Sequence, residues 1–490
     1  MTAEVCLLKG PRVPIGTPCN LPLMNSNTSQ SLTVLGSNKI HEILVKRIDQ
    51  QKQALGIIVG VIDPNGRRII AHGKLAATDS RMPDGDTIFE IGSISKIFTS
   101  LLLAEMVERK EVALEDRVAK YLPEHVTIPE RNSKAITLLD LSTHTSGLPP
   151  LPGNLLDKIV KRKNDPQSPD GDYTVDDLYQ FLCGYTLPRD PGSEFVYSNL
   201  GAGLLGHILA RRAGTDYESL IQTRIAQPLG MPDTAIALSA SMQQRMATGH
   251  NAALMPLAHA DLPLSLAGAG ALRSSVHDML TFLEAFLGYR ESPLAPAMKA
   301  MLEVHRPAGE AMIGLGWLIK STDGPEIVWH NGGTAGFRSF AGYDPKARTG
   351  VVVLANAFTQ GGVDDIGFHI LNPKAPLATP EPPAQHTEVR IDPKLLDNYT
   401  GRYQVTANLT LEVTRDGERL FAQGLAQFPH KPAGELTTLP KFELFAEGEK
   451  NFFAKVSDKQ VVFETGADGR ATGFILHQTG RQSVSAPRIV

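Results

Sequence analysis

A serine and a lysine three residues apart are the first residues in this sequence whose types and spacing could do chemistry. Ser93 and Lys96 lie in FEIGSISKIFTSLLLAEMVERKE, where a short apolar run leads directly into a long amphipathic segment. Residues i and i+3 share one face of a helix, so the hydroxyl and the amine would be neighbours in its first turn. A serine hydroxyl is a poor nucleophile until a base removes its proton. Lysine is such a base when burial or the helix dipole favours its neutral form, whereas the simpler interpretation is that Ser93 only caps the helix.

Tyr197 and Asn199 form a second candidate group, in PGSEFVYSNLGAGLLGHILARRAG just before another expected helix. A tyrosine hydroxyl can relay a proton between nucleophile, lysine and leaving group. An asparagine amide can hold the lysine and a substrate carbonyl. The structural alternative is an aromatic residue packed ahead of an N-cap asparagine.

The third candidate group is a histidine followed by glycines, in EIVWHNGGTAGFRSF. Gly332 and Gly333 at the end of an expected strand would let a substrate approach the backbone closely. The backbone N–H groups of Ser93 and Gly333 could then form an oxyanion hole, and His330 could donate to a substrate carboxylate or carbonyl. The structural alternative is a glycine-rich hairpin bend with a half-buried histidine.

Two β-rich regions, far apart in the sequence, must position these groups. LGIIVGVIDPNGRRIIAHGKL contains two β-runs around a hairpin signal at residues 63–66. An antiparallel meander is predicted after about Ile313 by four further runs, GLGWLIK, EIVWHNGG, RSFAGYDP and TGVVVLAN. The chain between the two β-rich regions, to about Arg306, has helical periods. Neither β-region could bury its faces alone. The sequence therefore predicts an α+β domain in which both ends build one antiparallel sheet flanked by helices.

Taken in order, the three groups resemble the three motifs of the penicillin-recognising serine hydrolases, here Ser93-x-x-Lys96, Tyr197-x-Asn199 and His330-x-Gly332. This family includes class C β-lactamases, DD-carboxypeptidases, D-aminopeptidases and related esterases. The surrounding phrases FEIGSISKIFTS, ITLLDLSTHTSGLP, FVYSNLGAGLLGHILA and WHNGGTAGFRSF are also similar to the family. The resemblance covers about residues 38–371. It implies an antiparallel sheet flanked by helices, an all-α subdomain, and a site in the groove between them.

The resemblance also implies roles for the catalytic residues. Ser93 would form the acyl-enzyme, Lys96 would serve as its base and Tyr197 would shuttle the proton. Lys96 and Tyr197 could instead share the role of base as a coupled pair. No motif implies a metal ion or an organic cofactor.

The same resemblance assigns substrate-binding residues and exposes one departure from the family pattern. Asn199 would orient the substrate, while His330, Gly332 and Gly333 would line the far wall of the site. Class C β-lactamases usually carry Lys-Thr-Gly where this chain has His-Asn-Gly. A histidine there is common in peptidase-like members, and it weakens the case for a fixed cation that would bind the β-lactam carboxylate.

The function implied is a serine hydrolase acting on β-lactams, on D-amino-acid-containing peptides, or on both. One alternative is a β-lactamase-like carboxylesterase that uses Ser93 and Lys96 on short-chain esters. A second is a non-catalytic penicillin-binding or cell-wall sensor protein, although such a protein would not need the lysine and tyrosine proton machinery. The sequence contains neither the G-x-S-x-G elbow of α/β-hydrolases nor a cluster of metal ligands such as H-E-x-x-H.

Four segments are expected along the chain. A flexible tail spans 1–37, the β-lactamase-like hydrolase domain 38–371, and a Pro-rich linker 372–388. Residues 389–490 alternate short β-runs and predict a small all-β, barrel-like domain. Its opening, LLDNYTGRYQV, is similar to the lipocalin-like barrels appended to some family members.

Net charge and apolar runs exclude some classes of partner and predict the cellular compartment. A formal net charge of −4 on 490 residues argues against nucleic acid and anionic membranes as partners. The family resemblance implies a small-molecule or peptide substrate. No apolar run approaches the about 18 residues that span a bilayer. The first residues lack the apolar core of a secretion signal, so the chain as written is expected in the cytoplasm, although family members are often periplasmic or secreted. A homo-oligomer is compatible with the sequence.

Four further polar residues near the motifs are interpreted as structural. His144 and Ser146, in LSTHTSGLP, suggest a second dyad, but residues two apart at a helix end seldom converge, so a capping turn is expected. Glu90 and Asp140 have no carboxylate partner at a motif spacing. Both are expected to be solvated or to cap a helix.

Overall fold

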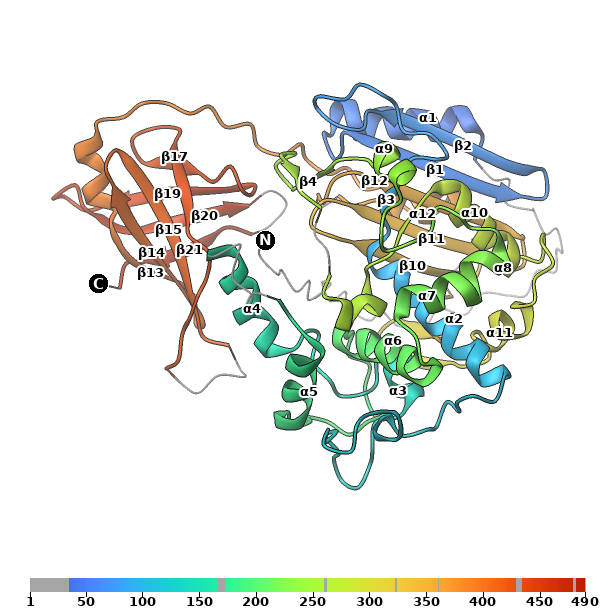
Figure 1. The fold of residues 1–490 in the computed structure, drawn as a ribbon. Coiled ribbons are helices and arrows are strands. Elements are labelled where there is room, and N and C mark those ends of the chain that lie inside the picture. The colour runs from blue at the N-terminus through green and yellow to red at the C-terminus, as the bar shows by residue number, and fades with distance from the viewer. Residues whose placement is uncertain are drawn as a thin grey trace, which may run out of the picture.

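The computed structural model describes residues 35–489 except 165–171, 260–261, 322–323, 360, 429–433 and 479–481. Within these residues, eight strands form an antiparallel sheet in the order β2-β1-β12-β11-β10-β9-β8-β7 (Figure 1). They span Gly56–Asp63 (β1), Gly66–Gly73 (β2), Arg306–Ala308 (β7), Ala311–Ile313 (β8), Leu318–Lys320 (β9), Ile327–Gly333 (β10), Arg338–Asp344 (β11) and Thr349–Ala355 (β12). Two short ladders complete this part: Phe89–Glu90 (β3) with Arg273–Ser274 (β6), and Gly249–His250 (β4) with Pro256–Leu257 (β5).

The sheet joins the two ends of the domain, as the sequence predicts. Strands β1 and β2 form a hairpin in which Asp63 pairs with Gly66, and β1 also pairs with β12, with Ile57 opposite Ala355. Every residue of β1 is buried, because helices cover both faces of the sheet at this strand. The expected meander is confirmed as strands β9 to β12.

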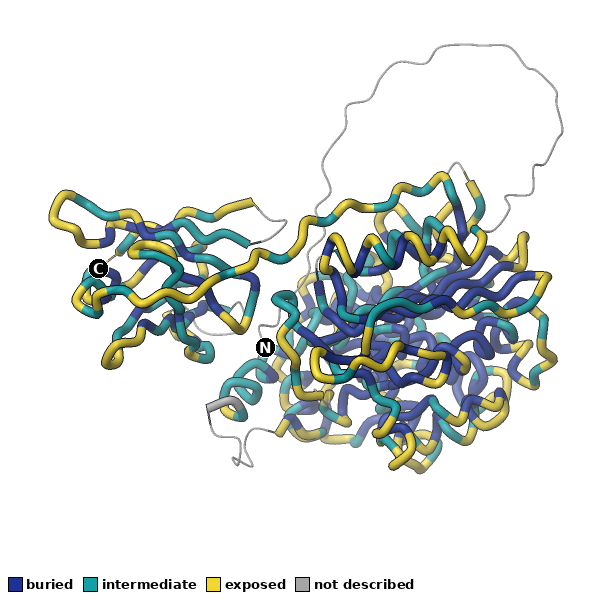
Figure 2. Tube along the Cα trace, turned by 90° about the horizontal axis from the view of Figure 1, so that it is seen from above, coloured by how far each residue is buried: buried dark blue, intermediate teal, exposed yellow. Residues whose placement is uncertain are grey.

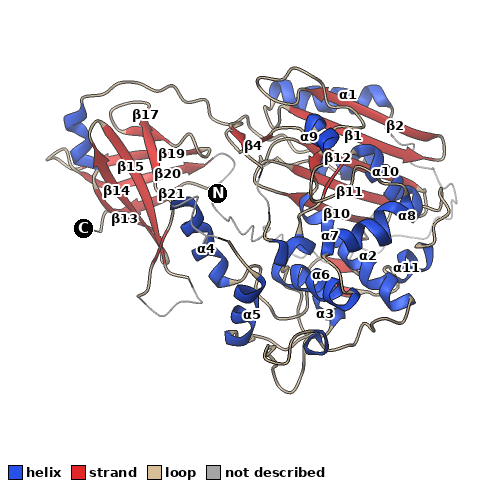
Figure 3. Ribbon diagram, viewed as in Figure 1, coloured by secondary structure: helices blue, strands red, loops and turns tan. Residues whose placement is uncertain are grey.

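Helices pack on both faces of this sheet (Figure 3). They span Ser37–Val45 (α1), Ser95–Glu108 (α2), Leu138–Ser142 (α3), Gly153–Asn164 (α4), Val175–Gly184 (α5), Asn199–Ala213 (α6), Tyr217–Ile221 (α7), Gln227–Leu229 (α8), Ala240–Arg245 (α9), Val276–Phe286 (α10), Ala295–Ala300 (α11) and Asp364–Leu371 (α12). Alternate side chains of β1 point to opposite faces of the sheet. Ile57 and Val59 pack with α1 and α12, whereas Ile58 and Ile62 pack in the larger core that contains α2 and α10.

Most helices between β3 and β6 form the expected all-α part, at the end of the sheet near β10 (Figure 1). Local caps explain where several of them begin. Thr137 and Asp140 make a reciprocal capping box at α3, and Thr174 and Asp177 make another at α5.

The α+β fold class is confirmed. Figure 2 shows the strands of the sheet mostly buried and the turns around them exposed.

Nine further strands build the C-terminal part in the described residues, with β16 paired only to β15. They span Gly401–Thr406 (β13), Leu409–Asp416 (β14), Arg419–Ala426 (β15), Thr437–Thr438 (β16), Phe442–Ala446 (β17), Asn451–Phe453 (β18), Lys459–Thr465 (β19), Ala471–Gln478 (β20) and Val484–Pro487 (β21). The Ile489 N–H donates to the Arg402 carbonyl at 2.8 Å, which joins the last residues to β13. The strands therefore form a nearly closed barrel, and the predicted barrel-like domain is confirmed.

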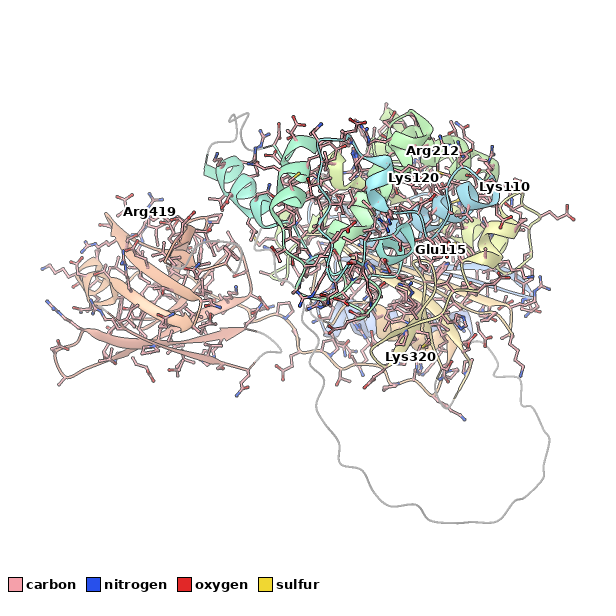
Figure 4. The ribbon with its side chains drawn as sticks, turned by 90° about the horizontal axis from the view of Figure 1, so that it is seen from below. Lys110, Glu115, Lys120, Arg212, Lys320 and Arg419 are labelled. Atoms are coloured by element: carbon pink, nitrogen blue, oxygen red, sulfur yellow. The ribbon has the colours of Figure 1, made fainter. Side chains whose placement is uncertain are left out.

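Other expectations concern the ends and the surface of the chain. The predicted tail falls mainly on residues 1–34, outside the described residues, and α1 begins at Ser37. Residues 376–392 form neither helix nor strand between α12 and the barrel, where the Pro-rich linker is expected. Charged side chains such as Lys120 and Arg212 on the helical part and Arg419 on the barrel lie at the surface (Figure 4). Within the described residues, no helix is both long and apolar enough to cross a bilayer.

Candidate active site

Ser93 lies in a single 3-10 turn, Gly92–Ile94, that leads from β3 into α2. The residue at the N-cap of α2 is Ile94, which makes no side-chain capping bond. Ser95, the other serine of the motif, uses its Oγ to accept the Leu272 N–H at 3.1 Å. Ser93 is therefore not a helix cap, and its hydroxyl is directed to other groups of the site.

Lys96 brings the first two motifs together. Its Nζ lies 2.9 Å from Ser93 Oγ, 2.7 Å from Asn199 Oδ1 and 2.5 Å from the Ala269 carbonyl oxygen. The side chain is buried, and this burial lowers the pKa of Lys96 to about 7. The Asn199 and Ala269 oxygens can only accept, so they take the two protons of a neutral amine. The remaining lone pair then faces Ser93 and can remove its proton.

Tyr197 covers the lysine with its ring and reaches the serine with its hydroxyl. Lys96 Nζ lies 4.9 Å from the centre of the Tyr197 ring. Burial raises the pKa of the Tyr197 hydroxyl above its usual value, and a hydrogen bond with the Ser93 side chain opposes that rise. A neutral phenol at pH 7 can relay a proton but is a weaker base than Lys96. This difference favours Lys96 over Tyr197 as the base.

The start of α6 fixes Asn199, although not in the expected way. The N-cap is Ser198, whose Oγ accepts the Gly201 N–H at 2.9 Å. Asn199 is the first helical residue, so its side chain is free of capping and binds Lys96 instead. The structural alternative, in which Asn199 is the N-cap, is therefore wrong, because Ser198 occupies that position.

The end of β10 lies directly against the segment that carries the nucleophile. A Cβ on Gly332 would overlap the Ile91 carbonyl oxygen, and a Cβ on Gly92 would lie 2.7 Å from the Gly333 nitrogen. Gly92 has a φ of +53°, which favours glycine for a second reason. Ser339 Oγ donates to the same Ile91 carbonyl at 2.8 Å. Gly92 and Gly332 thus permit the close approach of strand β10 to the segment that carries the nucleophile, whereas in the sequence the glycines at 332 and 333 predicted only the approach of a substrate.

His330 faces the same site but provides no positive charge. Burial and the nearby Lys96 lower the pKa of His330 to about 4, so the ring is neutral at pH 7. Its Nδ1 lies 2.5 Å from the Asn331 carbonyl oxygen, which can only accept, so the proton is on Nδ1. The Nε2 atom is consequently an acceptor, so the expectation that His330 donates to a substrate carboxylate or carbonyl is wrong. A substrate carboxylate would find no cation at this residue.

His144 is a member of this cluster that the sequence interpretation missed. Its buried ring lies 4.5 Å from the Tyr197 ring, between centres, and its Nδ1 accepts the Ser198 N–H at 3.2 Å. The Ser146 Oγ accepts the Leu148 N–H instead, so the two residues serve different partners. The phrase LSTHTSGLP in the family resemblance was the signal that could have identified His144.

Of the two carboxylates near the motifs, Asp140 behaves as expected and Glu90 does not. Asp140 caps α3 as expected and also pairs with Arg306 at 2.8 Å. Glu90 is buried, not solvated, and its Oε1 lies 3.5 Å from His259 and 3.7 Å from Arg273. The β3–β6 ladder buries it, because Glu90 pairs directly with Arg273 there. Within the described residues, no group of three or more His, Cys, Asp or Glu side chains could hold a metal ion.

Comparisons with known proteins agree with this geometry. Residues 42–371 match the β-lactamase family, and residues 385–486 match a domain of unknown function (DUF3471). The D-alanyl-D-alanine-carboxypeptidase/endopeptidase AmpH of Escherichia coli (strain K12) is 28% identical over 350 residues, 67% of this chain and 87% of that protein. Penicillin-binding protein 4* of Bacillus subtilis (strain 168) is 27% identical over 447 residues, 86% of this chain and 93% of that protein.

A solved structure gives the same result. The class C β-lactamase from Rhodobacter sphaeroides is 27% identical, with a TM-score of 0.58 over 68% of this chain and 97% of that chain. The chain belongs to the β-lactamase family. It is an enzyme, a serine hydrolase whose relatives are class C β-lactamases and D-alanyl-D-alanine carboxypeptidases. The family fits small-molecule or peptide substrates.

Proposed function

We propose that this enzyme hydrolyses β-lactams, D-amino-acid-containing peptides, or both, through an acyl-enzyme on Ser93. The observation that carries the proposal is the position of Lys96. Its Nζ lies 2.9 Å from Ser93 Oγ while Asn199 Oδ1 and the Ala269 carbonyl occupy its other two hydrogen-bonding directions. This arrangement directs the lone pair of a neutral lysine at the nucleophile.

The first chemical step follows from these contacts. Ser93 Oγ attacks the substrate carbonyl carbon as its proton passes to Lys96 Nζ, and the carbonyl π bond opens to an oxyanion. The backbone N–H groups of Ser93 and Gly333 would bind this oxyanion, because the glycine contacts hold the two segments together.

The leaving group and the second half-reaction use the same residues. Tyr197, hydrogen-bonded to Ser93 and lying over Lys96, passes its proton to the departing nitrogen as the C–N bond breaks and takes a proton from the Lys96 ammonium, which leaves Lys96 neutral again. Water then attacks the acyl carbonyl carbon while Lys96 or Tyr197 takes its proton. The bond from this carbon to Ser93 Oγ breaks, Ser93 Oγ takes that proton back, and the acid product leaves. Asn199 holds Lys96 and presents its amide N–H₂ to the substrate.

The substrate class is supported by the relatives and by His330. The relative that covers 86% of this chain is a penicillin-binding protein, and another is a carboxypeptidase and endopeptidase. The neutral His330 provides no cation for the β-lactam carboxylate where class C β-lactamases usually carry a lysine. We therefore expect β-lactams to acylate Ser93 without an ion pair between His330 and their carboxylate.

Intact-protein mass spectrometry after mixing with a fluorescent penicillin, in parallel with turnover of a short-chain nitrophenyl ester, tests the proposal. A penicillin adduct that Ser93→Ala abolishes supports it, and so does fast β-lactam turnover that Ser93→Ala abolishes. Ester turnover at Ser93 with neither penicillin adduct nor β-lactam turnover would assign the enzyme to the carboxylesterase branch. An adduct that survives Ser93→Ala would exclude Ser93 as the nucleophile.

A further inference from the structure

The loop that follows α3 is bound to the second motif along its backbone. The His144 carbonyl accepts the Val196 N–H at 2.8 Å. The Pro150 carbonyl accepts the Asn199 N–H at 2.9 Å. Tyr197 lies between these two points of attachment. The loop 144–150 therefore sets the path of the backbone that carries both Tyr197 and Asn199.

Within this loop, His144 adds two contacts from its side chain. Nδ1 accepts the Ser198 N–H at 3.2 Å, between the two backbone attachments. The ring lies against Tyr197 with 4.5 Å between centres, and Phe195 packs on it edge-on at 5.8 Å. The imidazole is 3% exposed, so it is enclosed among these groups.

The protonation state of His144 is determined by its surroundings. A backbone N–H can only donate, so Nδ1 must keep its lone pair and the ring must be neutral. Burial, together with the nearby Lys96 and His330, lowers the pKa of His144 well below its usual value, which agrees with this requirement. A protonated ring would direct an N–H at the Ser198 N–H and lose the bond.

The backbone conformation at His144 does not by itself require a histidine. Its φ is +56°, a left-handed conformation that residues other than glycine seldom adopt, although histidine adopts it more often than most. Glycine would fit this position without strain. The strained conformation directs the imidazole at the Ser198 backbone and the Tyr197 ring, so the side chain rather than the turn accounts for the histidine.

We propose that His144 is a positioning residue, which holds the Ser198 backbone and the Tyr197 ring so that Tyr197 and Asn199 reach Ser93 and Lys96. The role in catalysis rests on the proposed acyl-enzyme at Ser93. His144 acts through Tyr197 and Asn199 and does not touch the reacting carbonyl. A displacement of such groups by about 1 Å can reduce a rate by about 100-fold.

Two substitutions separate the contacts of His144. His144→Phe keeps a ring against Tyr197 but removes the acceptor for Ser198, and His144→Asn keeps an acceptor on a shorter side chain. The control is His207→Phe on α6, which removes a histidine whose Nε2 lies 2.7 Å from the hydroxyl of Tyr179 on α5. All three variants and the wild type are compared by thermal unfolding, by the pH profile of kcat/KM for penicillin or ester, and by hydrogen exchange.

The pH profile distinguishes positioning from a loss of folded protein. A displaced Tyr197 admits water to Lys96, which raises its pKa from about 7 towards the ordinary lysine value. We expect His144→Phe to reduce kcat/KM at pH 7 by about 10- to 100-fold and to move the acid limb to higher pH, with a smaller effect in His144→Asn. A uniform reduction across pH, equal to that of His207→Phe, would overturn the proposal.

Hydrogen exchange in the peptide that contains residues 196–201 tests the same contact without any turnover. His144→Phe should accelerate exchange of the Ser198 amide, whereas His207→Phe should leave it unchanged. If the wild type shows no acylation of Ser93, the proposed function fails, yet the exchange result still decides whether His144 holds the motif. Unchanged exchange in His144→Phe would refute the inference.

Discussion

A Cβ atom on Gly92 would lie 2.7 Å from the backbone nitrogen of Gly333. These residues are far apart in the sequence, one directly before the nucleophile and the other at the end of β10. Their contact places the backbone segments that carry Ser93 and Gly333 next to each other. An oxyanion hole built from the backbone N–H groups of Ser93 and Gly333 depends on the absence of a side chain at residue 92.

Gly92→Ala is therefore expected to lower the acylation rate strongly while most of the protein still folds. The added methyl would push β10 away from Ser93 and displace one oxyanion donor, a loss worth about 100- to 1,000-fold in rate. Gly362→Ala is a matched control, because Gly362 has a φ of +52° but open space at its Cβ position. Both variants should lose about 1–2 kcal/mol of unfolding free energy from the left-handed backbone, and Gly92→Ala should lose more because its methyl also displaces β10. Equal acylation rates in the two variants, measured with a fluorescent penicillin, would show that the contact does not matter.

The three motifs and the sheet could be predicted because their signals are local. The continuous apolar run of β1 and the turn at residues 63–66 identify a hairpin before any tertiary contact is known. Helix α2 shows the limit of this reasoning. Its sequence suggested one buried face, but every residue from 95 to 106 is buried, because helices of the all-α part and α11 surround it.

His144 could not be assigned from spacing for a related reason. Its partners Tyr197 and Ser198 lie more than fifty residues further along the chain, and only the packing of the α3 loop against α6 brings them together. Glu90 was misjudged likewise, because its burial comes from pairing with β6. Local patterns thus predict elements and motif order, while contacts between distant loops need the structure.

Asn199→Asp should shift the pH dependence of acylation upwards. The substitution places a carboxylate 2.7 Å from Lys96 Nζ, and an opposite charge at this distance raises the pKa of a lysine by about 1–3 units. The amine would then be protonated at pH 7, so kcat/KM there should fall by about tenfold or more and recover as the pH rises. The pH profile of kcat/KM provides the measurement, with Asn199→Ala as an uncharged comparison. The idea fails if the two variants have the same acid limb.

Arg488→Ala should weaken the barrel and leave Ser93 chemistry intact. The Arg488 guanidinium donates to the Thr400 carbonyl at 2.7 Å and to the Ala471 carbonyl at 3.2 Å, at the seam beside β13. Loss of both bonds should cost the barrel about 2 kcal/mol, detected by thermal unfolding and limited proteolysis. Arg419→Ala, an exposed arginine of the same barrel, should change stability by about 0.5 kcal/mol or less (Figure 4). A loss of penicillin labelling in Arg488→Ala would mean that the barrel supports the site.

The burial of Lys96 also predicts how stability depends on pH. The pKa of this lysine is about 7 in the folded enzyme and near 10.5 when unfolded, so the unfolded chain binds more protons between these values. The contribution of Lys96 to the free energy of unfolding should therefore rise with pH from about 7 to 10.5 and be constant below 7. In Lys96→Met this contribution is absent, whereas the loss of contacts to Asn199 and Ala269 does not change with pH.

Urea unfolding of the wild type and Lys96→Met at pH 6, 7, 8 and 9.5 isolates this contribution as a difference. The wild type should gain stability relative to the variant at each step above pH 7, and the difference should vary little between pH 6 and 7. A pH-independent difference would mean that Lys96 titrates as an ordinary lysine. It would then be charged at neutral pH, and the base for Ser93 would have to be another group.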